Sequence, residues 1–261
     1  MRHKKSPALS IKQSIAAIDF DGTVSPGLIL ARLLEQGFTI GMFDSSTEKT
    51  YRAMDEAFHE RKISFEVFDA QIIELFTNNI REKTKSDLDA VAARVFEKYR
   101  DWRYTFTAAL LETLIPTHEC IGITGAMHEV VELLAPYWGF DQSYCTRLEV
   151  NEHGRYTGRH IEVPAMDKSA ALLAHITVCG GSLANSVAVG DTGSDISMLA
   201  AVDHPIAFNP NHTLGAKAEQ EGWPIVVERK DEIYVLHRGV YRMFATEDVA
   251  TAAQYVLSLK R

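Results

Sequence analysis

Two aspartates stand one residue apart in AAIDFDGT, directly after a short apolar run. Alternate residues of an extended chain project to the same side, so the carboxylates of Asp19 and Asp21 can converge on one point. Two converging carboxylates are costly without a cation, because each disfavours the ionised form of the other. A hard divalent ion such as Mg²⁺ removes that cost, and GDTGSD later in the chain offers further oxygens. We therefore predict a Mg²⁺ site formed by Asp19, Asp21, Asp191 and Asp195.

The first two carboxylates also suggest a division of chemical roles. A carboxylate oxygen can attack a phosphoryl group that a metal ion holds, which makes Asp19 the candidate nucleophile and gives an aspartyl-phosphate. The departing alkoxide needs a proton, and Asp21, beside other negative charges, is the candidate general acid and base. The pair therefore predicts cleavage of a C–O–P ester.

The oxygens of a transferred phosphoryl group need donors besides the metal. Thr124 and the Gly125 amide, at the expected start of a helix, are candidates. Lys168 begins the helical stretch KSAALL, and the helix dipole favours anions rather than cations at a helix start. A lysine at this unfavourable position points to a role in binding phosphate. His128 can also approach such a site, although a surface position at the first turn of a helix explains it better.

Each of these short motifs is weak by itself. Asp-x-Asp is common in surface turns, and Gly-Asp-x-x-x-Asp also fits the capped start of a helix. All of them nevertheless fall at predicted strand ends or helix starts, in one order along the chain. A common site is therefore the better interpretation.

The elements that position these residues follow from hydrophobic periodicity. Apolar runs that end in polar or glycine-containing turns predict buried strands at residues 14–20, 120–125, 186–191, 204–210 and 224–228. Helical stretches alternate with the later strands, at 126–138, 166–176, 194–201 and 213–223. This alternation predicts an α/β fold with a doubly wound parallel sheet, whose ligands bind beyond the carboxyl ends of the strands.

One interval interrupts the alternation. Between Leu28 and about Ile115 only helical periodicity appears, so we predict an all-helical cap at 28–115 with a small core of its own. The α/β core is then discontinuous, at 1–27 and 116–261. Alternating polarity predicts a hairpin or extended excursion at 143–163, and the tail offers another hairpin at 233–244 and a final helix at about 247–259.

The composition excludes several classes of function. A net charge of −8 disfavours binding to nucleic acids and to anionic membranes, so we expect neither partner. The first apolar stretch, Ile15 to Ile18, is too short for a signal sequence and no later run approaches a membrane span, so we expect a cytoplasmic protein. The three cysteines, Cys120, Cys145 and Cys179, lack Cys-x-x-Cys spacing, which indicates neither a disulfide framework nor a zinc site.

The series DFDGT, GITGA, DKSAAL and GDTGSD resembles the four motifs of the haloacid dehalogenase superfamily of aspartate-nucleophile phosphohydrolases. The likeness covers roughly residues 14–228, and the helical insertion after the first motif looks like the phosphoserine phosphatase-like branch. The resemblance implies a Rossmann-like core with a mobile lid. It also implies these roles: Asp19 as nucleophile and metal ligand, Asp21 as acid and base and a carbonyl ligand, Thr124 and Lys168 as phosphate-holding residues, Asp191 as metal ligand, and Asp195 as a ligand or its partner.

Two departures from that branch bear on the substrate. Gly22 stands where phosphoserine-specific members usually have serine, and Leu28 stands where they place an acidic residue for the substrate amino group. An apolar residue there leaves an ammonium group unpaired, which is costly. Cap residues should therefore set the specificity, and Arg52, Arg61 and Lys62 are candidates, although charged residues on cap helices are commonly only solvated.

The sequence thus predicts a Mg²⁺-dependent phosphomonoesterase that acts on a small phosphorylated metabolite through a phospho-Asp19 intermediate. A departing alkoxide needs a proton, whereas a departing halide does not. The presence of Asp21 as a proton donor therefore favours phosphatase activity over dehalogenase activity. Phosphoserine phosphatase proper, phosphotransfer to an alcohol, and a non-catalytic module that binds a phosphorylated ligand or a protein remain alternatives. The oligomeric state and the role of the segment after about Glu228 do not follow from the sequence.

Overall fold

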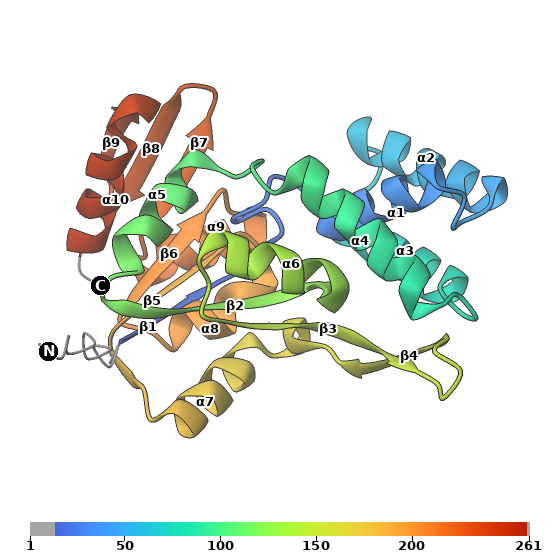
Figure 1. Cartoon of the computed structure of the whole chain (residues 1–261). Coiled ribbons are helices and arrows are strands. Elements are labelled where there is room, and N and C mark those ends of the chain that lie inside the picture. Colours follow the sequence, from blue (N-terminus) through green and yellow to red (C-terminus); the bar gives the residue numbers. More distant parts are fainter. Residues whose placement is uncertain (1–13, 260–261) are drawn as a thin grey trace, which may run out of the picture.

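The computed structural model describes residues 14–259 and contains a nine-stranded sheet in the order β4-β3-β2-β1-β5-β6-β7-β8-β9 (Figure 1). The basic first residues, 1–13, on which part of our expectation about signal sequences rests, lie outside the described range. From β3 to β7 neighbouring strands run parallel, whereas β4 at one edge and β8 and β9 at the other are antiparallel. The strands are β1 (Ser14–Ile18), β2 (His118–Met127), β3 (Gln142–Val150), β4 (Tyr156–Glu162), β5 (Ser182–Gly190), β6 (His204–Phe208), β7 (Ile225–Arg229), β8 (Glu232–His237) and β9 (Val240–Ala245).

Helices cover both faces of this sheet, because the central strands are apolar on both sides. In β1, Ala16 and Ile18 join one hydrophobic cluster, while Ile15 and Ala17 join another on the opposite face. Helices α5 (Thr105–Leu114), α6 (His128–Trp138) and α10 (Val249–Ser258) pack on the first face. Helices α7 (Lys168–Cys179), α8 (Ile196–Ala200) and α9 (His212–Glu221) pack on the second. The predicted doubly wound α/β fold is confirmed.

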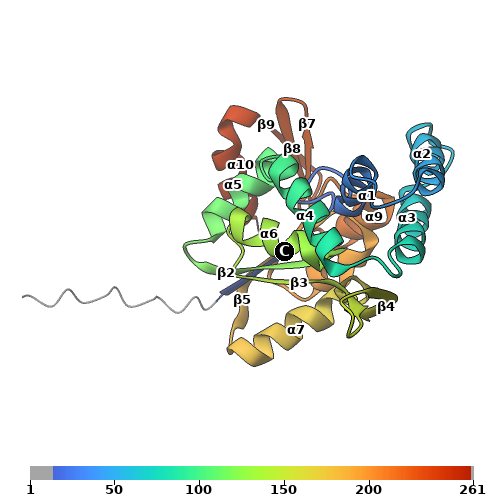
Figure 2. The same ribbon diagram turned by 45° about the vertical axis from the view of Figure 1, so that its right-hand side comes forward.

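The helical insertion forms four helices that Figure 2 shows beside the sheet: α1 (Ile29–Thr39), α2 (Ser45–His59), α3 (Phe65–Asn79) and α4 (Lys85–Tyr99). Three of them begin where a side chain accepts a hydrogen bond from the first turn, at Asp44, Ser64 and Thr84. The expectation of a separate small core is wrong, because buried residues of these helices and of the first sheet face form one continuous cluster. No helix within residues 14–259 is long and apolar enough to cross a membrane.

Helix α5 lies inside the range that we predicted for the cap, yet it packs against α10 and β2. The division into a cap at 28–115 and a discontinuous core stays a prediction, and these contacts favour placing its second boundary before α5. The tail after Glu228 gives β8, β9 and α10, so it extends the sheet and supplies the helix on which α5 rests (Figure 1). The predicted hairpins, β3–β4 and β8–β9, are both present.

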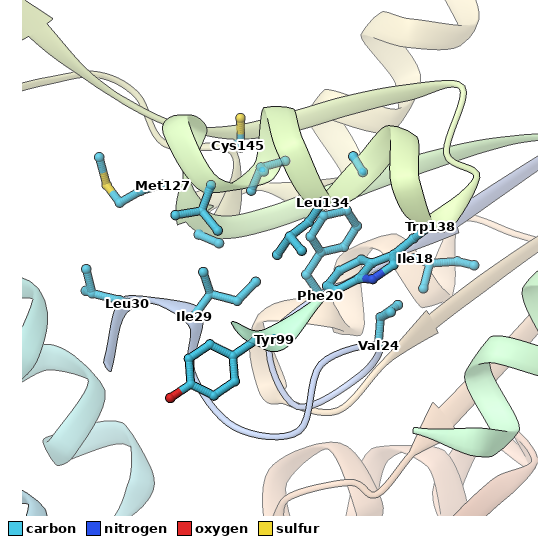
Figure 3. Packing of buried hydrophobic residues seen from close by; sticks show 14 of the residues in the cluster. Ile18, Phe20, Val24, Ile29, Leu30, Tyr99, Met127, Leu134, Trp138 and Cys145 are labelled. Carbon is cyan, nitrogen blue, oxygen red and sulfur yellow. The ribbon is translucent and has the colours of Figure 1, made fainter. Parts of the chain in front are cut away.

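The residue between the two aspartates anchors them to the core. Phe20 is fully buried, and its ring centroid lies 5.2 Å from that of Trp138 and 4.8 Å from that of Phe140 (Figure 3). A Cβ atom on Gly122 would lie 2.5 Å from this ring, so the glycine of the second motif makes room for Phe20. With Phe20 fixed in the core, Asp19 and Asp21 are left at the end of β1, where both line a cavity.

Candidate active site

The predicted motifs meet at the carboxyl end of β1, the strand whose neighbours β2 and β5 continue the sheet in opposite directions. Such a switch in strand order leaves a crevice in which doubly wound sheets bind their ligands. Here the crevice is a cavity of about 150 Å³. Asp19, Asp21, Gly125, Lys168 and Asp191 all line it, as the sequence led us to expect.

Lys168 joins two of the predicted carboxylates. Its Nζ lies 2.6 Å from Asp19 Oδ1 and 2.6 Å from Asp195 Oδ1, and all three residues are buried, with at most 4% of their surface exposed. Helix α7 starts at Lys168 because the preceding Asp167 accepts a hydrogen bond from the Ala170 amide. Burial lowers the pKa of Lys168, but the two carboxylates outweigh burial and raise it above its ordinary value, so the ammonium stays charged.

Asp195 uses both carboxylate oxygens within the protein. Its Oδ1 accepts from Lys168, while its Oδ2 accepts from the amides of Asp191, at 3.1 Å, and Thr192, at 2.9 Å. Gly190 is required for this approach, because a Cβ atom there would lie 2.3 Å from Asp195 Cγ. Of the two roles implied for Asp195, these contacts favour that of a partner, which positions Lys168 and the loop that carries Asp191.

The donor set fits a hard divalent cation. One oxygen from each of Asp19, Asp191 and Asp195 lies within 4.8 Å of the others. Within residues 14–259 the ion pairs of these three carboxylates are those of Lys168 with Asp19 and with Asp195. Burial, opposed by Lys168, raises the pKa of Asp19 to about 7, and burial with the charge of Asp19 raises the pKa of Asp191 well above its usual range. A cation bound to carboxylate oxygens relieves this surplus of buried negative charge.

Asp21 is placed differently from the other aspartates. Its side chain lies outside the carboxylate cluster, and its Oδ1 accepts a hydrogen bond of 2.6 Å from the backbone amide of Ile29, at the start of α1. Burial raises the pKa of Asp21 to about 6, although that hydrogen bond opposes the rise. A carboxyl group with this pKa can hold or release a proton near neutral pH, which suits a general acid and base. Its predicted carbonyl contact to a metal stays a prediction.

The second motif departs from the expected local structure. We predicted that the Gly125 amide lies at the start of a helix, and this is wrong. Strand β2 continues to Met127, and α6 begins only at His128. Gly125 still lines the cavity, and its carbonyl accepts a 2.7 Å hydrogen bond from the hydroxyl of Thr146 on β3. Thr124 is fully buried, and its hydroxyl accepts from the Ala126 amide at 3.1 Å.

The other candidates do not line this cavity. Arg52 and Lys62 are about half exposed or more and pair with glutamates, Arg52 with Glu35 and Glu48 and Lys62 with Glu60. The exposed Arg61 lies in the turn after α2, and His128 contacts Cys145 and Arg147. The structure thus gives no support to a role for Arg52, Arg61, Lys62 or His128 in this site.

Several polar residues that line the cavity were not expected from the sequence, among them Asp69 and Thr77 on α3 and His160 on β4. His160 Nε2 lies 3.2 Å from the Thr77 hydroxyl, a contact that joins the helical insertion to the β3–β4 hairpin. One signal was available for Asp69, because Phe65, Asp69, Ile73 and Phe76 recur at helical spacing and all line the cavity. A lone carboxylate in an otherwise apolar stripe marks a residue with a special environment.

Comparison with known proteins agrees with this geometry. Residues 16–200 match the model of the haloacid dehalogenase-like hydrolase family. Among curated proteins, the inhibition of morphological differentiation protein of Streptomyces azureus is 31% identical over 121 residues, covering 44% of this chain and 43% of that protein. The histidinol-phosphatase of Neisseria meningitidis is 26% identical over 123 residues, covering 43% of this chain and 55% of the enzyme. The match therefore spans about half the length of these relatives.

Two solved structures are similar in fold. A protein of unknown function from Bordetella pertussis Tohama I has a TM-score of 0.67 at 22% identity, and covers 82% of this chain and 98% of its own. A phospho-aspartyl intermediate analogue of phosphoserine phosphatase has a TM-score of 0.57 at 20% identity, and covers 84% and 95%. The family model matches the greater part of the sequence, including the segments that carry Asp19, Lys168 and Asp191, and the chain therefore belongs to the haloacid dehalogenase-like hydrolase family.

Proposed function

We propose that this protein is a Mg²⁺-dependent phosphomonoesterase that hydrolyses a small organic phosphate through a phospho-Asp19 intermediate. The observation that carries the proposal is the buried cluster of Asp19, Asp191 and Asp195 around Lys168 at a cavity. The family membership and the phosphatase names of several relatives support it. Asp19 and Asp191 would hold the ion, which would supply charge neutralisation for the phosphoryl oxygens.

Asp19 is prepared for nucleophilic attack. Lys168 binds its Oδ1 at 2.6 Å, which orients the carboxylate and favours its ionised form, while its Oδ2 has only a long contact, 3.4 Å, with the Thr23 hydroxyl. In the first step a bond forms between an Asp19 oxygen and phosphorus while the bond from phosphorus to the ester oxygen breaks. Gly125 and Lys168 line the same cavity, which supports their role as donors to the phosphoryl oxygens in this proposal.

Asp21 moves the proton in both steps. In its protonated form it donates to the departing ester oxygen, so the product leaves as an alcohol rather than an alkoxide. Asp21 then accepts a proton from the water that attacks the phosphorus of phospho-Asp19, which releases inorganic phosphate and restores both carboxyl groups. The amide of Ile29 holds Asp21 Oδ1 at 2.6 Å, which leaves its other oxygen to handle the proton.

The chemistry is tested with p-nitrophenyl phosphate and purified protein. We expect turnover with Mg²⁺, its loss in EDTA and its recovery when Mg²⁺ is restored, and a near-complete loss in Asp19→Asn. Asp89→Asn, an exposed change on α4, is the matched control and should retain wild-type turnover. Turnover that survives both EDTA and Asp19→Asn contradicts the proposal. Added alcohols distinguish phosphotransfer, which would yield a new phosphate ester in place of inorganic phosphate.

A further inference from the structure

The cavity contains a carboxylate that the proposed chemistry does not use. Asp69 of α3 lines the same cavity as Asp19 and Asp21 and is half-buried. Within residues 14–259 its carboxylate forms no ion pair and accepts no side-chain hydrogen bond. Burial raises the pKa of Asp69 above its usual value, because the charged form is disfavoured away from water.

The rest of the cavity wall is mostly apolar. The apolar residues that line it include Leu28, Phe65, Ile73 and Phe76, together with Met127 and Val163 from the sheet side. Among the lining residues, Lys168 is the one lysine or arginine, and it already binds Asp19 and Asp195. A ligand can therefore find a partner for a positive group at Asp69, but it finds no lysine or arginine that is available to pair with a carboxylate.

We propose that the substrate is the phosphate ester of a small amino alcohol, or of an alcohol with another cationic nitrogen such as an imidazolium, and that it carries no carboxylate. This proposal rests on the phosphatase activity proposed above. The phosphate binds at Asp19 and Lys168, the apolar body lies against the wall, and the cationic nitrogen pairs with Asp69. An ammonium group removed from water against apolar side chains is costly without such a partner, so Asp69 selects for the cation.

This assignment changes the conclusion that we drew from Leu28. The sequence offered no acidic residue at that position for a substrate ammonium group, and Leu28 indeed lines the cavity as an apolar side chain. Asp69 approaches the same cavity from α3 and provides the missing charge. Phosphoserine remains disfavoured for a different reason, because Lys168 is the one lysine or arginine among the lining residues and it already binds Asp19 and Asp195.

The test compares three small esters: 3-aminopropyl phosphate, propyl phosphate, which lacks the amino group, and O-phosphoserine, which adds a carboxylate. For the wild-type protein with Mg²⁺, kcat/KM should be about 10- to 100-fold higher for 3-aminopropyl phosphate than for propyl phosphate, the range of a hydrogen bond to a charged group. O-phosphoserine should be a poorer substrate than 3-aminopropyl phosphate. In Asp69→Asn the ratio between the amino and propyl esters should fall close to one, chiefly through a higher KM for the amino ester. Glu74→Gln, an exposed change on the same helix, should leave the ratio as in the wild type.

The outcomes separate the two proposals. Hydrolysis of p-nitrophenyl phosphate and propyl phosphate without a preference for the amino ester overturns the assignment of Asp69 and leaves the phosphatase function intact. A preference that survives Asp69→Asn overturns the assignment as well. Failure to hydrolyse any of these esters with Mg²⁺ overturns the proposed function, and the substrate class falls with it.

A second candidate site lies on the sheet face that α7 covers, and it rests on a different observation. One ligand atom from each of Glu119 on β2 and His175 and Cys179 on α7 lies within 4.8 Å of the others. His175 is 5% exposed, and its Nδ1 lies 2.9 Å from the Tyr144 hydroxyl. Its buried Nε2 makes no hydrogen bond within the described chain, although Glu119 Oε1 lies 3.3 Å away.

We propose that these three residues bind Zn²⁺ or a similar transition-metal ion, with water as a fourth ligand. Imidazole, thiolate and carboxylate are the groups that Zn²⁺ prefers in tetrahedral sites. The Tyr144 hydroxyl can accept from Nδ1–H of His175, which leaves the lone pair of Nε2 for the metal. Lys168 is the first and Cys179 the last of the twelve residues of α7, so this site lies at the opposite end of the helix from the aspartate cluster. Sequence spacing could not indicate it, because β2 contributes one of the ligands.

Binding of Co²⁺ at this site can be distinguished spectroscopically from binding at the aspartate cluster. A thiolate ligand gives Co²⁺ an intense near-ultraviolet charge-transfer band, which the oxygen ligands of the aspartate cluster cannot produce. We expect the band in the full chain and in Asp191→Asn, its loss in Cys179→Ser and His175→Gln, and its displacement by Zn²⁺. Circular dichroism establishes that each variant is folded. Absence of the band in the wild type, or its persistence in folded Cys179→Ser, overturns the proposal.

Discussion

A Cβ atom on Gly22 would lie 1.9 Å from Oδ2 of Asp191, and the Gly22 backbone has a φ of +74°. Glycine is therefore required at this position of the first motif for two reasons. Its backbone is left-handed, and the loop that follows β5 passes too close to leave room for a side chain. From the sequence alone, Gly22 stands out only as a departure from phosphoserine-specific enzymes. In this structure a serine at that position would push against a residue of the carboxylate cluster.

Gly22→Ser should therefore damage activity beyond its effect on stability. Gly27 is the matched control, because its φ is +77° and a Cβ atom there would meet nothing within 4 Å. Both serine variants should lose about 1–2 kcal/mol of unfolding free energy through the left-handed backbone. Only Gly22→Ser should also lower kcat/KM for p-nitrophenyl phosphate, because it displaces Asp191. Equal activities for the two variants, measured below their melting temperatures, would contradict this account.

Lys168→Met should remove most of the activity. The substitution takes away the cation that binds Asp19 and Asp195 at 2.6 Å each, so Asp19 loses its orientation and the phosphoryl group loses a donor. Loss of one such donor typically costs about 10²- to 10³-fold in kcat. Lys217→Met, on α9, is the control, because that lysine pairs with Glu221 at the surface. A kcat for Lys168→Met within a few-fold of wild type would exclude the proposed role.

The sequence was sufficient to predict that the aspartates and Lys168 lie close together. It was not sufficient to predict which residues we propose to select the substrate. Asp19 and Asp191 follow parallel strands, whose carboxyl ends meet at one edge of the sheet, so strand prediction already brings them together. Asp69 and His160 reach the cavity from a cap helix and from a hairpin. Their positions depend on how α3 packs against β4, a tertiary contact that local periodicity does not encode.

The tail illustrates the same limit. Its strands and its helix follow from local patterns, but the partner of α10 does not, because α10 packs on α5 from a distant part of the chain. The predicted cap boundary is uncertain from the sequence for the same reason: α5 has the helical periodicity of the preceding helices, and its contacts with α10 and β2 are what favour a boundary before it.

Without a divalent ion, the protein should lose stability as the pH rises from about 4 to about 7. Burial raises the pKa of Asp19 from 3.8 to about 7 and that of Asp21 from 3.8 to about 6, so the folded protein retains protons that the unfolded chain has released. A carboxyl group with a raised pKa stabilises the fold below its unfolded pKa, and this contribution is lost as the pH rises through the folded pKa. Thermal unfolding in EDTA at several pH values measures the effect.

Mg²⁺ should reverse that loss, so its effect on the melting temperature should be larger at about pH 8 than at about pH 5. Asp19→Asn removes one of the titrating groups and should show a shallower pH dependence in EDTA. The same increase in melting temperature at both pH values, or a metal-free protein that becomes more stable as the pH rises, would contradict the assignment of buried, metal-binding carboxylates.

Glu228→Gln should destabilise the protein by about 1 kcal/mol through the start of α5. The Glu228 carboxylate accepts hydrogen bonds from the amides of Thr105, at 2.9 Å, and Phe106, at 2.7 Å, where Tyr104 provides no side-chain cap. Glutamine keeps the shape but removes the negative charge that favours a helix start. For a chain of this size the melting temperature should fall by about 3 °C.

The matched control for that loss is Glu219→Gln, an exposed change on α9 that should leave the melting temperature unchanged. The start of α5 also supports the loop after the paired aspartates, because the Thr107 hydroxyl donates to the Thr23 carbonyl at 2.9 Å and the Tyr104 amide donates to the Val24 carbonyl at 3.0 Å. Glu228→Gln should therefore increase amide hydrogen exchange in α5 before it does so in α9. A uniform increase across the chain would show that Glu228 contributes only to global stability.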